Sequence, residues 1–416
     1  MKNINITQLD NGIKIISEKN DFVKSFSLGF WFNVGSRDES PLNNGISHFL
    51  EHMFFKGTKK RSAKKIAEQI ESLGGYLNAF TSKEHTCFYG RGLTGHVEET
   101  FEVLSDMVQN SVFKQSEIDK EIGVVIDELN DIEDSPEELI FDKFESNIFK
   151  GNPIGMPIIG TEKNLLSFKR NDLLKYISEQ YGLDRFYIVA SGYINHKQLI
   201  KLTEKYLSKN LSASCEVKRS LLLSPSTDLF VEKDTQQVHY IIGRPTYGIK
   251  DKRRIAVSVL SHILGEGSSS RLFQKVREEN GITYQINSFL NSFYDVSSFG
   301  IYFSTSEKSV NKVQNIIYDE VKKIKERKVS EKELNRAKEY LIGNMLMGLE
   351  GTTNRMLRIA QSMIYFNKVK SVEETIRQIK TVTPEIIREI SNEIFENGAL
   401  TRVILSNKNF LMHKAA

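Results

Sequence analysis

Two imidazoles and a carboxylate lie within a short apolar run near the start of the chain, in the sequence His48-Phe49-Leu50-Glu51-His52. In a helix, residues three and four apart share a face, so His48, Glu51 and His52 would form one stripe. Three ionisable groups in an apolar helix are costly unless their charge is compensated. A zinc ion compensates them well, because two imidazoles one turn apart can bind one metal. The stripe therefore predicts a zinc site whose carboxylate takes a proton from a water molecule.

The residues on either side of the stripe predict the limits of its helix. The run 46–55 is otherwise apolar apart from Ser47. Asn43 and Asn44 precede it as candidate caps, and Gly57 follows it as a stop signal. The alternative is a solvated surface helix in which the spacing is a coincidence. The phenylalanine and leucine side chains on its other faces argue against that alternative.

A third metal ligand must come from elsewhere in the chain, because a catalytic zinc site commonly has three protein ligands. The remaining histidines are scattered without ligand spacing, which leaves an acidic residue as the better candidate. An acidic helix that opens at Ser116 offers Glu121 and Glu128, which are seven residues apart and so lie on one face. Spacing alone does not choose between them.

Length and composition limit the class of protein. A chain of 416 residues is expected to form two or more domains, and 39% hydrophobic and 26% charged residues are typical of soluble globular proteins. The net charge of +4 gives no support for nucleic-acid binding, and no apolar run is long enough for a membrane span. Two distant cysteines and a start unlike a signal or transit peptide predict a cytoplasmic protein, most simply bacterial. A mature organellar form is the alternative.

The elements that must position these side chains repeat along the chain after roughly 210 residues. In the first half we expect strands at 22–34, 76–90 and 185–192 and helices at 46–56, 63–73, 97–109 and from Ser116. In the second half we expect strands at 237–243, 283–291, 298–305 and 400–405 and helices at 255–264, 269–279, 310–327 and from Ser330. The last strand of each half is expected at a sheet edge.

This repeat predicts an α+β protein of two homologous lobes that arose by internal duplication, each a β-sheet packed with helices. The predicted domains are a zinc-binding catalytic lobe at 1–211 and a second lobe at 227–416, joined by a linker at about 212–226. Where the zinc motif would recur, the second lobe carries Leu260-Ser261-His262-Ile263-Leu264. Only the first lobe is therefore expected to bind zinc.

The stretch from His48 to Thr58 resembles the zinc signature of the pitrilysin family of inverted-motif metallopeptidases. It is most similar to the processing-peptidase members, namely the mitochondrial β subunits and their bacterial relatives. The family's third ligand is a glutamate 76 residues after the second histidine, which corresponds to Glu128. A helper glutamate seven residues earlier corresponds to Glu121. The resemblance implies that His48, His52 and Glu128 bind one zinc ion and that Glu51 is the general base.

Two further segments match the family and imply contacts with substrate. The strand Gly74–Thr81 resembles the substrate-binding edge strand, whose residues here are Asn78, Ala79, Phe80 and Thr81. An extended peptide would pair with it through the backbone; the alternative is an ordinary internal strand. The segment Ser268–Phe273, followed by Arg277 and Tyr284, matches the family's second signature. It implies that Arg277 and Tyr284 hold the substrate, whereas the alternative is a surface ion pair and a packed aromatic.

The resemblance also implies a substrate preference. Glu138 and Asp142 are one helical turn apart, at positions where the mitochondrial β subunits carry the acids that recognise an arginine two residues before the cut. A pair of carboxylates suits a guanidinium. The expected function is therefore zinc endoproteolysis of short or unfolded, basic, presequence-like peptides within a closed chamber, by a monomer or a homodimer. The alternatives are a general oligopeptidase and a non-catalytic core subunit of the same fold.

Overall fold

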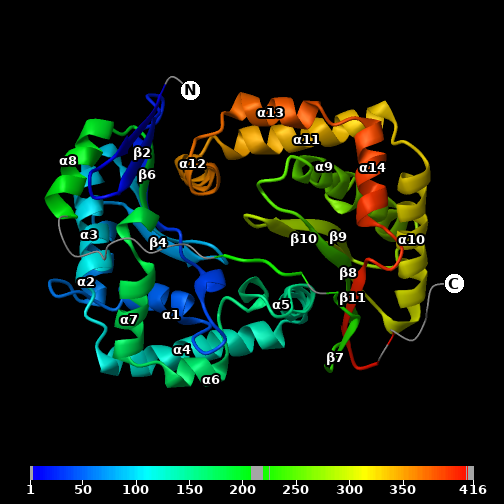
Figure 1. Cartoon of the computed structure of the whole chain (residues 1–416), viewed down its shortest axis with the longest axis horizontal. Helices are drawn as coiled ribbons and strands as arrows, with labels where there is room; N and C mark the ends of the chain where they lie inside the picture. The colour runs from blue at the N-terminus through cyan, green and yellow to red at the C-terminus, as the bar shows by residue number, and fades with distance from the viewer. Residues whose placement is uncertain (1–2, 208–218, 224, 409, 411–416) are drawn as a thin grey trace. The chain divides into compact units, whose positions relative to one another are not determined.

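The computed structural model describes residues 3–207, 219–223, 225–408 and 410. They form two compact units, each with one β-sheet and several helices (Figure 1). Unit 1 takes the described residues within 1–130, 156–220 and 348–370, and unit 2 takes those within 131–155, 221–347 and 371–416. The predicted α+β class is confirmed.

Unit 1 is built on a six-stranded sheet in the order β1-β2-β6-β3-β5-β4. Its strands are β1 (Ile4–Gln8), β2 (Lys14–Lys19), β3 (Ser25–Phe32), β4 (Tyr76–Thr81), β5 (Thr86–Leu93) and β6 (Phe186–Gly192). Its helices are α1 (Ile46–Phe54), α2 (Ala63–Glu71), α3 (Val97–Asn110), most of α4 (Gln115–Asp134), α6 (Glu162–Ser167), α7 (Arg170–Gln180), α8 (His196–Tyr206) and α12 (Thr352–Phe366).

Unit 2 is built on a five-stranded sheet in the order β7-β11-β8-β10-β9. Its strands are β7 (Leu229–Glu232), β8 (Val238–Tyr247), β9 (Gln285–Ser292), β10 (Val296–Thr305) and β11 (Thr401–Ser406). Its helices are α5 (Pro136–Ile148), α9 (Arg254–Gly265), the π-helix η5 (Phe273–Glu278), α10 (Val310–Glu326), α11 (Glu331–Gly348), α13 (Val372–Lys380) and α14 (Pro384–Ile394).

The two sheets share one topology. Strand β2 runs parallel to β6, which continues antiparallel through β3, β5 and β4. In the same way β7 runs parallel to β11, which continues antiparallel through β8, β10 and β9. The five strands also occur in the same chain order in both sheets, and β1 is an addition to the first. This shared topology confirms the predicted duplication.

Each sheet is covered on one face by a helix from the other half of the sequence. In unit 1, α12 packs on β2, β3 and β6, with the buried cluster Ile16, Trp31, Cys87, Tyr187, Val189, Met356, Ile359, Ala360 and Met363. In unit 2, α5, blue-green in Figure 1, packs beside β8 and β11, with the buried cluster Leu139, Ile140, Phe144, Ile148, Phe149, Ile154, Ile241, Val296, Tyr302, Val403 and Leu405. The two covering helices occupy equivalent places in the chain: α5 follows the long helix α4, and α12 follows the long helix α11. Each half of the sequence thus gives one helix to the sheet of the other half.

The compact units therefore differ from the predicted contiguous lobes at 1–211 and 227–416. An apolar stripe shows that a helix is buried, but it does not identify the sheet that buries it. Within the predicted linker, Arg219 donates hydrogen bonds to Asp38 in unit 1, and the Leu222 amide donates to Asn152 in unit 2. Residues 212–218 and 224 of that linker lie outside the described residues.

Two expectations about strands were wrong. The strand expected at 76–90 is a hairpin of β4 and β5, whose turn is closed by the Ser82 amide donating to the His85 carbonyl. The closing strands β6 and β11 lie inside their sheets and not at the edges, because β2 and β7 pair with them on the outer side. Their nearly complete burial is the pattern of internal strands.

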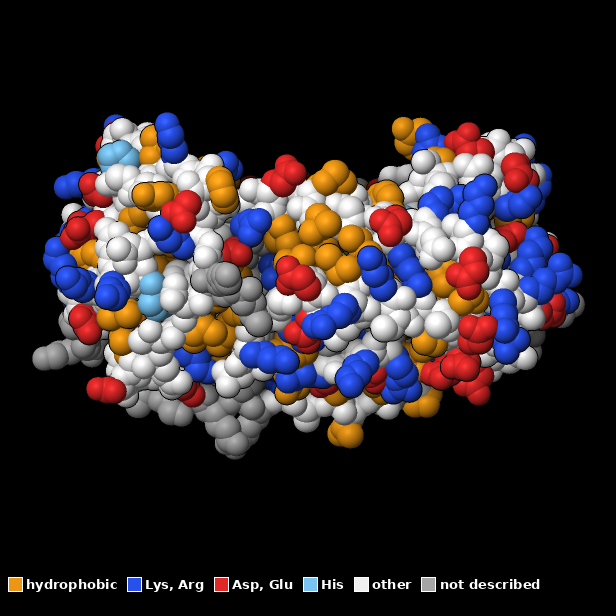
Figure 2. Space-filling view, turned by 90° about the horizontal axis from the view of Figure 1, so that it is seen from above, with side chains coloured by type: hydrophobic (Ala, Val, Ile, Leu, Met, Phe, Trp, Pro, Cys, Tyr) orange, Lys and Arg blue, Asp and Glu red, His pale blue; other side chains and the backbone are white. Residues whose placement is uncertain are grey.

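The surface carries charges of both signs. On the face shown in Figure 2, Lys and Arg side chains lie interspersed with Asp and Glu side chains, with hydrophobic groups between them. This distribution agrees with the small net charge of the sequence. Among the described residues, no helix combines the length and the apolar character needed to cross a bilayer.

Candidate metal centre and active site

Helix α1 begins at a constrained backbone position. Its N-cap is Gly45, at φ 99°, where an added Cβ would lie 2.6 Å from the Ile159 carbonyl oxygen. The buried Glu39 carboxylate accepts hydrogen bonds from the Gly45 and Ser47 amides, each at 2.8 Å. The predicted caps were wrong: Asn44 instead donates to Glu39 and to the Pro157 carbonyl. A carboxylate at a helix N-terminus is favourable, so Glu39 fixes the start of α1.

The predicted metal ligands come together in unit 1. Helix α1 supplies His48 and His52, and α4 supplies Glu128. The Nε2 atom of each histidine lies 3.6 Å from a Glu128 oxygen, with a different oxygen facing each ring. One donor atom from each of the three residues lies within 4.8 Å of the others. Among the described residues, these three form the one such group of His, Cys, Asp or Glu.

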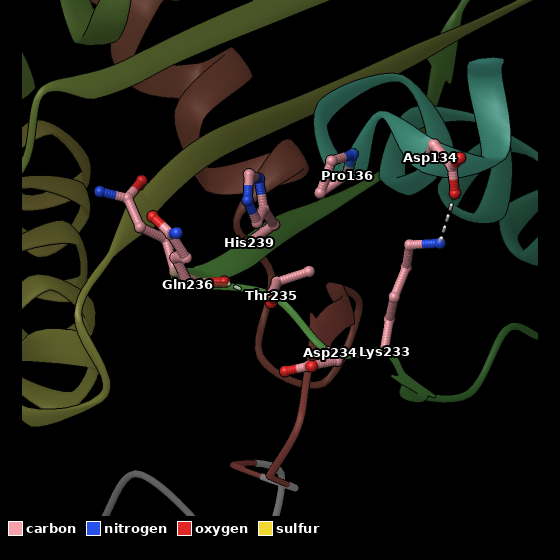
Figure 3. A pocket seen from close by; sticks show the side chains of 8 residues that line it. Asp134, Pro136, Lys233, Asp234, Thr235, Gln236 and His239 are labelled. Carbon is pink, nitrogen blue, oxygen red and sulfur yellow. Dashed lines mark hydrogen bonds and ion pairs between the residues drawn. The ribbon is translucent and has the colours of Figure 1, made fainter.

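This donor set fits zinc. Donors about 2.1 Å from a tetrahedral zinc ion are roughly 3.4 Å apart, close to the separations between Glu128 and the two histidines. A pocket in unit 2 contains acidic residues and a histidine but does not bring three metal-binding side chains together. It is lined by Asp134, Pro136, Lys233, Asp234, Thr235, Gln236, Gln237 and His239 (Figure 3). There Asp134 faces Lys233 at 4.0 Å and not His239.

Burial and neighbouring charges shift the two histidines in opposite directions. Burial, aided by the charge of His52, lowers the pKa of His48 to about 4, so this imidazole is neutral and able to bind a metal. Burial also acts to lower the pKa of His52, but the hydrogen bond to Glu121 and the charges of Glu128, Glu121 and Glu51 together raise it. The three carboxylates therefore attract positive charge to this face of α1, as a site for a divalent cation requires.

Glu51 lies on the same helix face and is held by the neighbouring strand. Its carboxylate accepts a hydrogen bond of 2.6 Å from the Thr81 hydroxyl at the end of β4. Burial raises the pKa of Glu51, against the effect of this hydrogen bond. A carboxylate with a raised pKa that is fixed beside a metal site is suited to accept and return a proton.

Glu121 lies behind His52, away from Glu128. It is 4% exposed, and its Oε1 lies 2.9 Å from His52 Nδ1. Its Oε2 lies 2.5 Å from Lys56 Nζ. Burial acts to raise the pKa of Glu121, but the hydrogen bonds from His52 and Lys56 lower it. Lys56 was not among the predicted site residues, although its position four residues after His52 places it on the same side of the helix end.

The predicted substrate strand lies at an edge of its sheet. Strand β4 is the last strand of the unit 1 sheet and pairs with β5 on its inner side. Its alternation turns Thr81 toward Glu51, with Ala79 on the same face. The side chains of Asn78 and Phe80 lie on the opposite face, where Phe80 packs edge-on against Trp31 at 5.5 Å between ring centroids.

Arg277 and Tyr284 meet in unit 2. The guanidinium lies 4.5 Å from the centre of the Tyr284 ring and donates a hydrogen bond to the Tyr284 carbonyl. The Tyr284 side chain is 74% exposed. Arg277 belongs to η5, where the structure has a π-helix in place of most of the ordinary helix expected at 269–279. Short π-helical segments are rare and occur frequently at functional sites.

The predicted arginine-binding pair lies on α5 in unit 2. Glu138 is in the first turn of the helix and is exposed, while Asp142 is one turn later and half-buried. The buried residues Ile140 and Phe144 on other sides of α5 hold the helix against the sheet.

Comparison with known proteins identifies the family. Residues 14–162 match the family described as insulinase (peptidase family M16), and residues 167–341 match the peptidase M16 inactive domain. A protein of Rickettsia bellii, described as an uncharacterized zinc protease, is 34% identical over 407 residues, which are 98% of each chain. The chain belongs to peptidase family M16. The predicted resemblance to the pitrilysin family is thereby confirmed.

Two other known proteins also match nearly the whole chain. A protein of Bacillus subtilis, described as the uncharacterized zinc protease YmxG, is 35% identical over 397 residues, which are 94% of this chain and 96% of the relative. A protease of Helicobacter pylori of known structure has a TM-score of 0.91 at 21% identity and covers 97% of this chain and 99% of its own. That structural match supports the two-sheet fold. Residues 167–341, which match the inactive domain, do not contain the metal motif.

Proposed function

We propose that this M16 chain is a zinc-dependent endopeptidase that cleaves short or unfolded peptides. The observation that carries the proposal is the convergence of His48, His52 and Glu128, with Glu51 on the same helix face. The relatives in Rickettsia bellii and Bacillus subtilis are both described as zinc proteases. Two imidazoles and one carboxylate are the number and kind of protein ligands that a catalytic zinc ion commonly has.

Each residue of the site has a separate role in peptide hydrolysis. When bound, zinc supplies Lewis-acid polarisation of a water molecule and of the scissile carbonyl. Glu51 takes the proton of the attacking water and passes it to the leaving amine. Thr81 holds one oxygen of Glu51, so the other oxygen is left for this transfer. Glu121 keeps His52 in the ring orientation that turns Nε2 toward Glu128.

Substrate binding uses backbone contacts and a second group of side chains. Asn78, Ala79, Phe80 and Thr81 pair with an extended peptide through the outer edge of β4, the last strand of its sheet. Pairing through the backbone makes binding tolerant of side-chain identity. Arg277 and Tyr284 hold the substrate backbone. The exposed Tyr284 ring and the π-helix that carries Arg277 support this role.

The metal dependence provides the direct test. Purified protein incubated with a chelator should lose its activity on a quenched peptide library and regain it with about one zinc ion per chain. Zinc content and peptide cleavage are measured on the same samples. Cleavage that persists in metal-free protein would contradict the proposal.

The acidic pair on α5 bears on which peptides are cleaved. We propose that Glu138 and Asp142 bind an arginine two residues upstream of the cleaved bond, through paired charge-assisted hydrogen bonds. Replacing that arginine by alanine in a peptide should lower kcat/KM. The corresponding loss of transition-state stabilisation should be about 1.5–3 kcal/mol, as expected for hydrogen bonds to a charged group.

The test compares the two peptides with the wild type and the double variant Glu138→Gln, Asp142→Asn. The double variant should cut both peptides with nearly equal kcat/KM. As a matched control, Glu133→Gln removes an exposed acid from α4 and should leave the preference intact. Equal cleavage of both peptides by the wild type would identify a general oligopeptidase instead of a processing enzyme.

A further inference from the structure

The carboxylate of Glu121 lies between a histidine of the metal centre and a lysine. One oxygen is 2.9 Å from His52 Nδ1, and the other is 2.5 Å from Lys56 Nζ. Glu121 is 4% exposed, whereas the Lys56 side chain is 31% exposed. A buried carboxylate with both oxygens engaged has little freedom to rotate.

The position of Lys56 follows from the way α1 ends. The helix stops at Phe54, and the Lys56 amide still donates to the Met53 carbonyl, which continues the last turn. Lys56 is therefore one turn beyond His52 and on the same side. The next residue, Gly57, has φ 117° and turns the chain away. Both contacts of Glu121 thus come from one end of a single helix.

Charge also favours a cation at this place. Glu51, Glu121 and Glu128 bring three carboxylates to one small region, of which Glu121 is the most deeply buried. A zinc ion offsets two of these charges, and Lys56 offsets the third. A buried carboxylate without a paired cation is costly and would turn toward water.

We propose that Lys56 is a positioning residue for the metal centre, acting through Glu121 on His52. By holding one oxygen of Glu121, Lys56 directs the other to His52 Nδ1. The proton is thereby kept on Nδ1, and the Nε2 lone pair is directed toward Glu128 and the metal. This inference rests on the zinc site of the proposed function.

The proposal predicts the direction of a change in zinc affinity. If Lys56 acted only as a positive charge near the metal, its removal would tighten zinc binding. If it positions Glu121, its removal should weaken zinc binding about tenfold, at the lower end of the effects expected for groups that orient metal ligands. The sign of the change therefore separates the two roles.

The experiment measures the zinc dissociation constant of the full chain by competition with a chelating dye. Lys56→Met should bind zinc about tenfold more weakly, and Lys56→Arg should restore most of the affinity, because a guanidinium also donates to a carboxylate. Lys60→Met removes an exposed lysine four residues later and should bind as the wild type does. Thermal unfolding of the zinc-free variants shows whether each is folded.

A second pair of variants tests the route of the effect. In a Glu121→Ala background, Lys56→Met should cause no further loss of zinc affinity, since Lys56 would have nothing to position. An additive loss, an unchanged affinity or tighter binding in Lys56→Met would overturn the proposal. A wild type that bound no zinc would contradict the proposed function. A wild type and a Lys56→Met variant that bound zinc equally well would contradict only the role of Lys56.

Discussion

Changing Glu51 to Gln is expected to lower kcat by on the order of 10³-fold, within the range that general acid–base catalysis supplies. Glutamine has the size of glutamate, and its Oε1 can still accept the hydrogen bond from the Thr81 hydroxyl. It has no carboxylate to take the proton of the attacking water. The variant should keep about one zinc ion per chain, because Glu51 is not one of the three converging donors.

Variants of the three metal ligands provide the comparison for Glu51→Gln. His48→Ala, His52→Ala and Glu128→Ala each remove one converging donor and should lose both zinc and activity. Elemental analysis and peptide hydrolysis, measured on the same preparations, separate the two classes. A Glu51→Gln variant with full activity would contradict the role of Glu51 as the base, whatever its zinc content.

The part of the site that could be predicted from residue spacing is the part carried by one helix. His48, Glu51 and His52 share a face because of the helical period, and the structure places them so. The choice of Glu128 over Glu121 required the family resemblance, because both lie on one face of α4. The structure shows how they differ: Glu128 faces both Nε2 atoms, and Glu121 faces Nδ1 of His52.

Other features depend on contacts that a local pattern does not contain. Glu39 lies six residues before the N-cap Gly45 and outside any capping pattern of α1, yet its carboxylate accepts hydrogen bonds from the Gly45 and Ser47 amides. Gly45 is required by the close approach of Gly160, which is distant in sequence. The class of each long element was predictable from its periodicity. The sheet that each amphipathic helix covers was not, as α5 and α12 demonstrate.

The exchange of α5 and α12 predicts that neither half of the sequence folds alone. Fragment 1–211 lacks α12, whose buried side chains Met356, Ile359 and Met363 cover one face of the unit 1 sheet. Burying a side chain of this size contributes about 1.5–3 kcal/mol. Three such losses are comparable with the whole stability of a typical domain, about 5–15 kcal/mol. Fragment 227–416 likewise lacks α5 over the unit 2 sheet.

Each fragment expressed alone should therefore be insoluble or unfolded, whereas the two expressed together should purify as one non-covalent complex that binds zinc. Circular dichroism, co-purification through a tag on one fragment and zinc content provide the readouts. Ile359→Asp in fragment 227–416 should prevent the complex from forming, because it places a charge in the contact between α12 and the sheet. Gln361→Asp, on the exposed side of the same helix, is the matched control and should leave the complex intact. A fragment 1–211 that folds alone and binds zinc as tightly as the whole chain would show that α12 is dispensable, and the exchange would then have no role in stability.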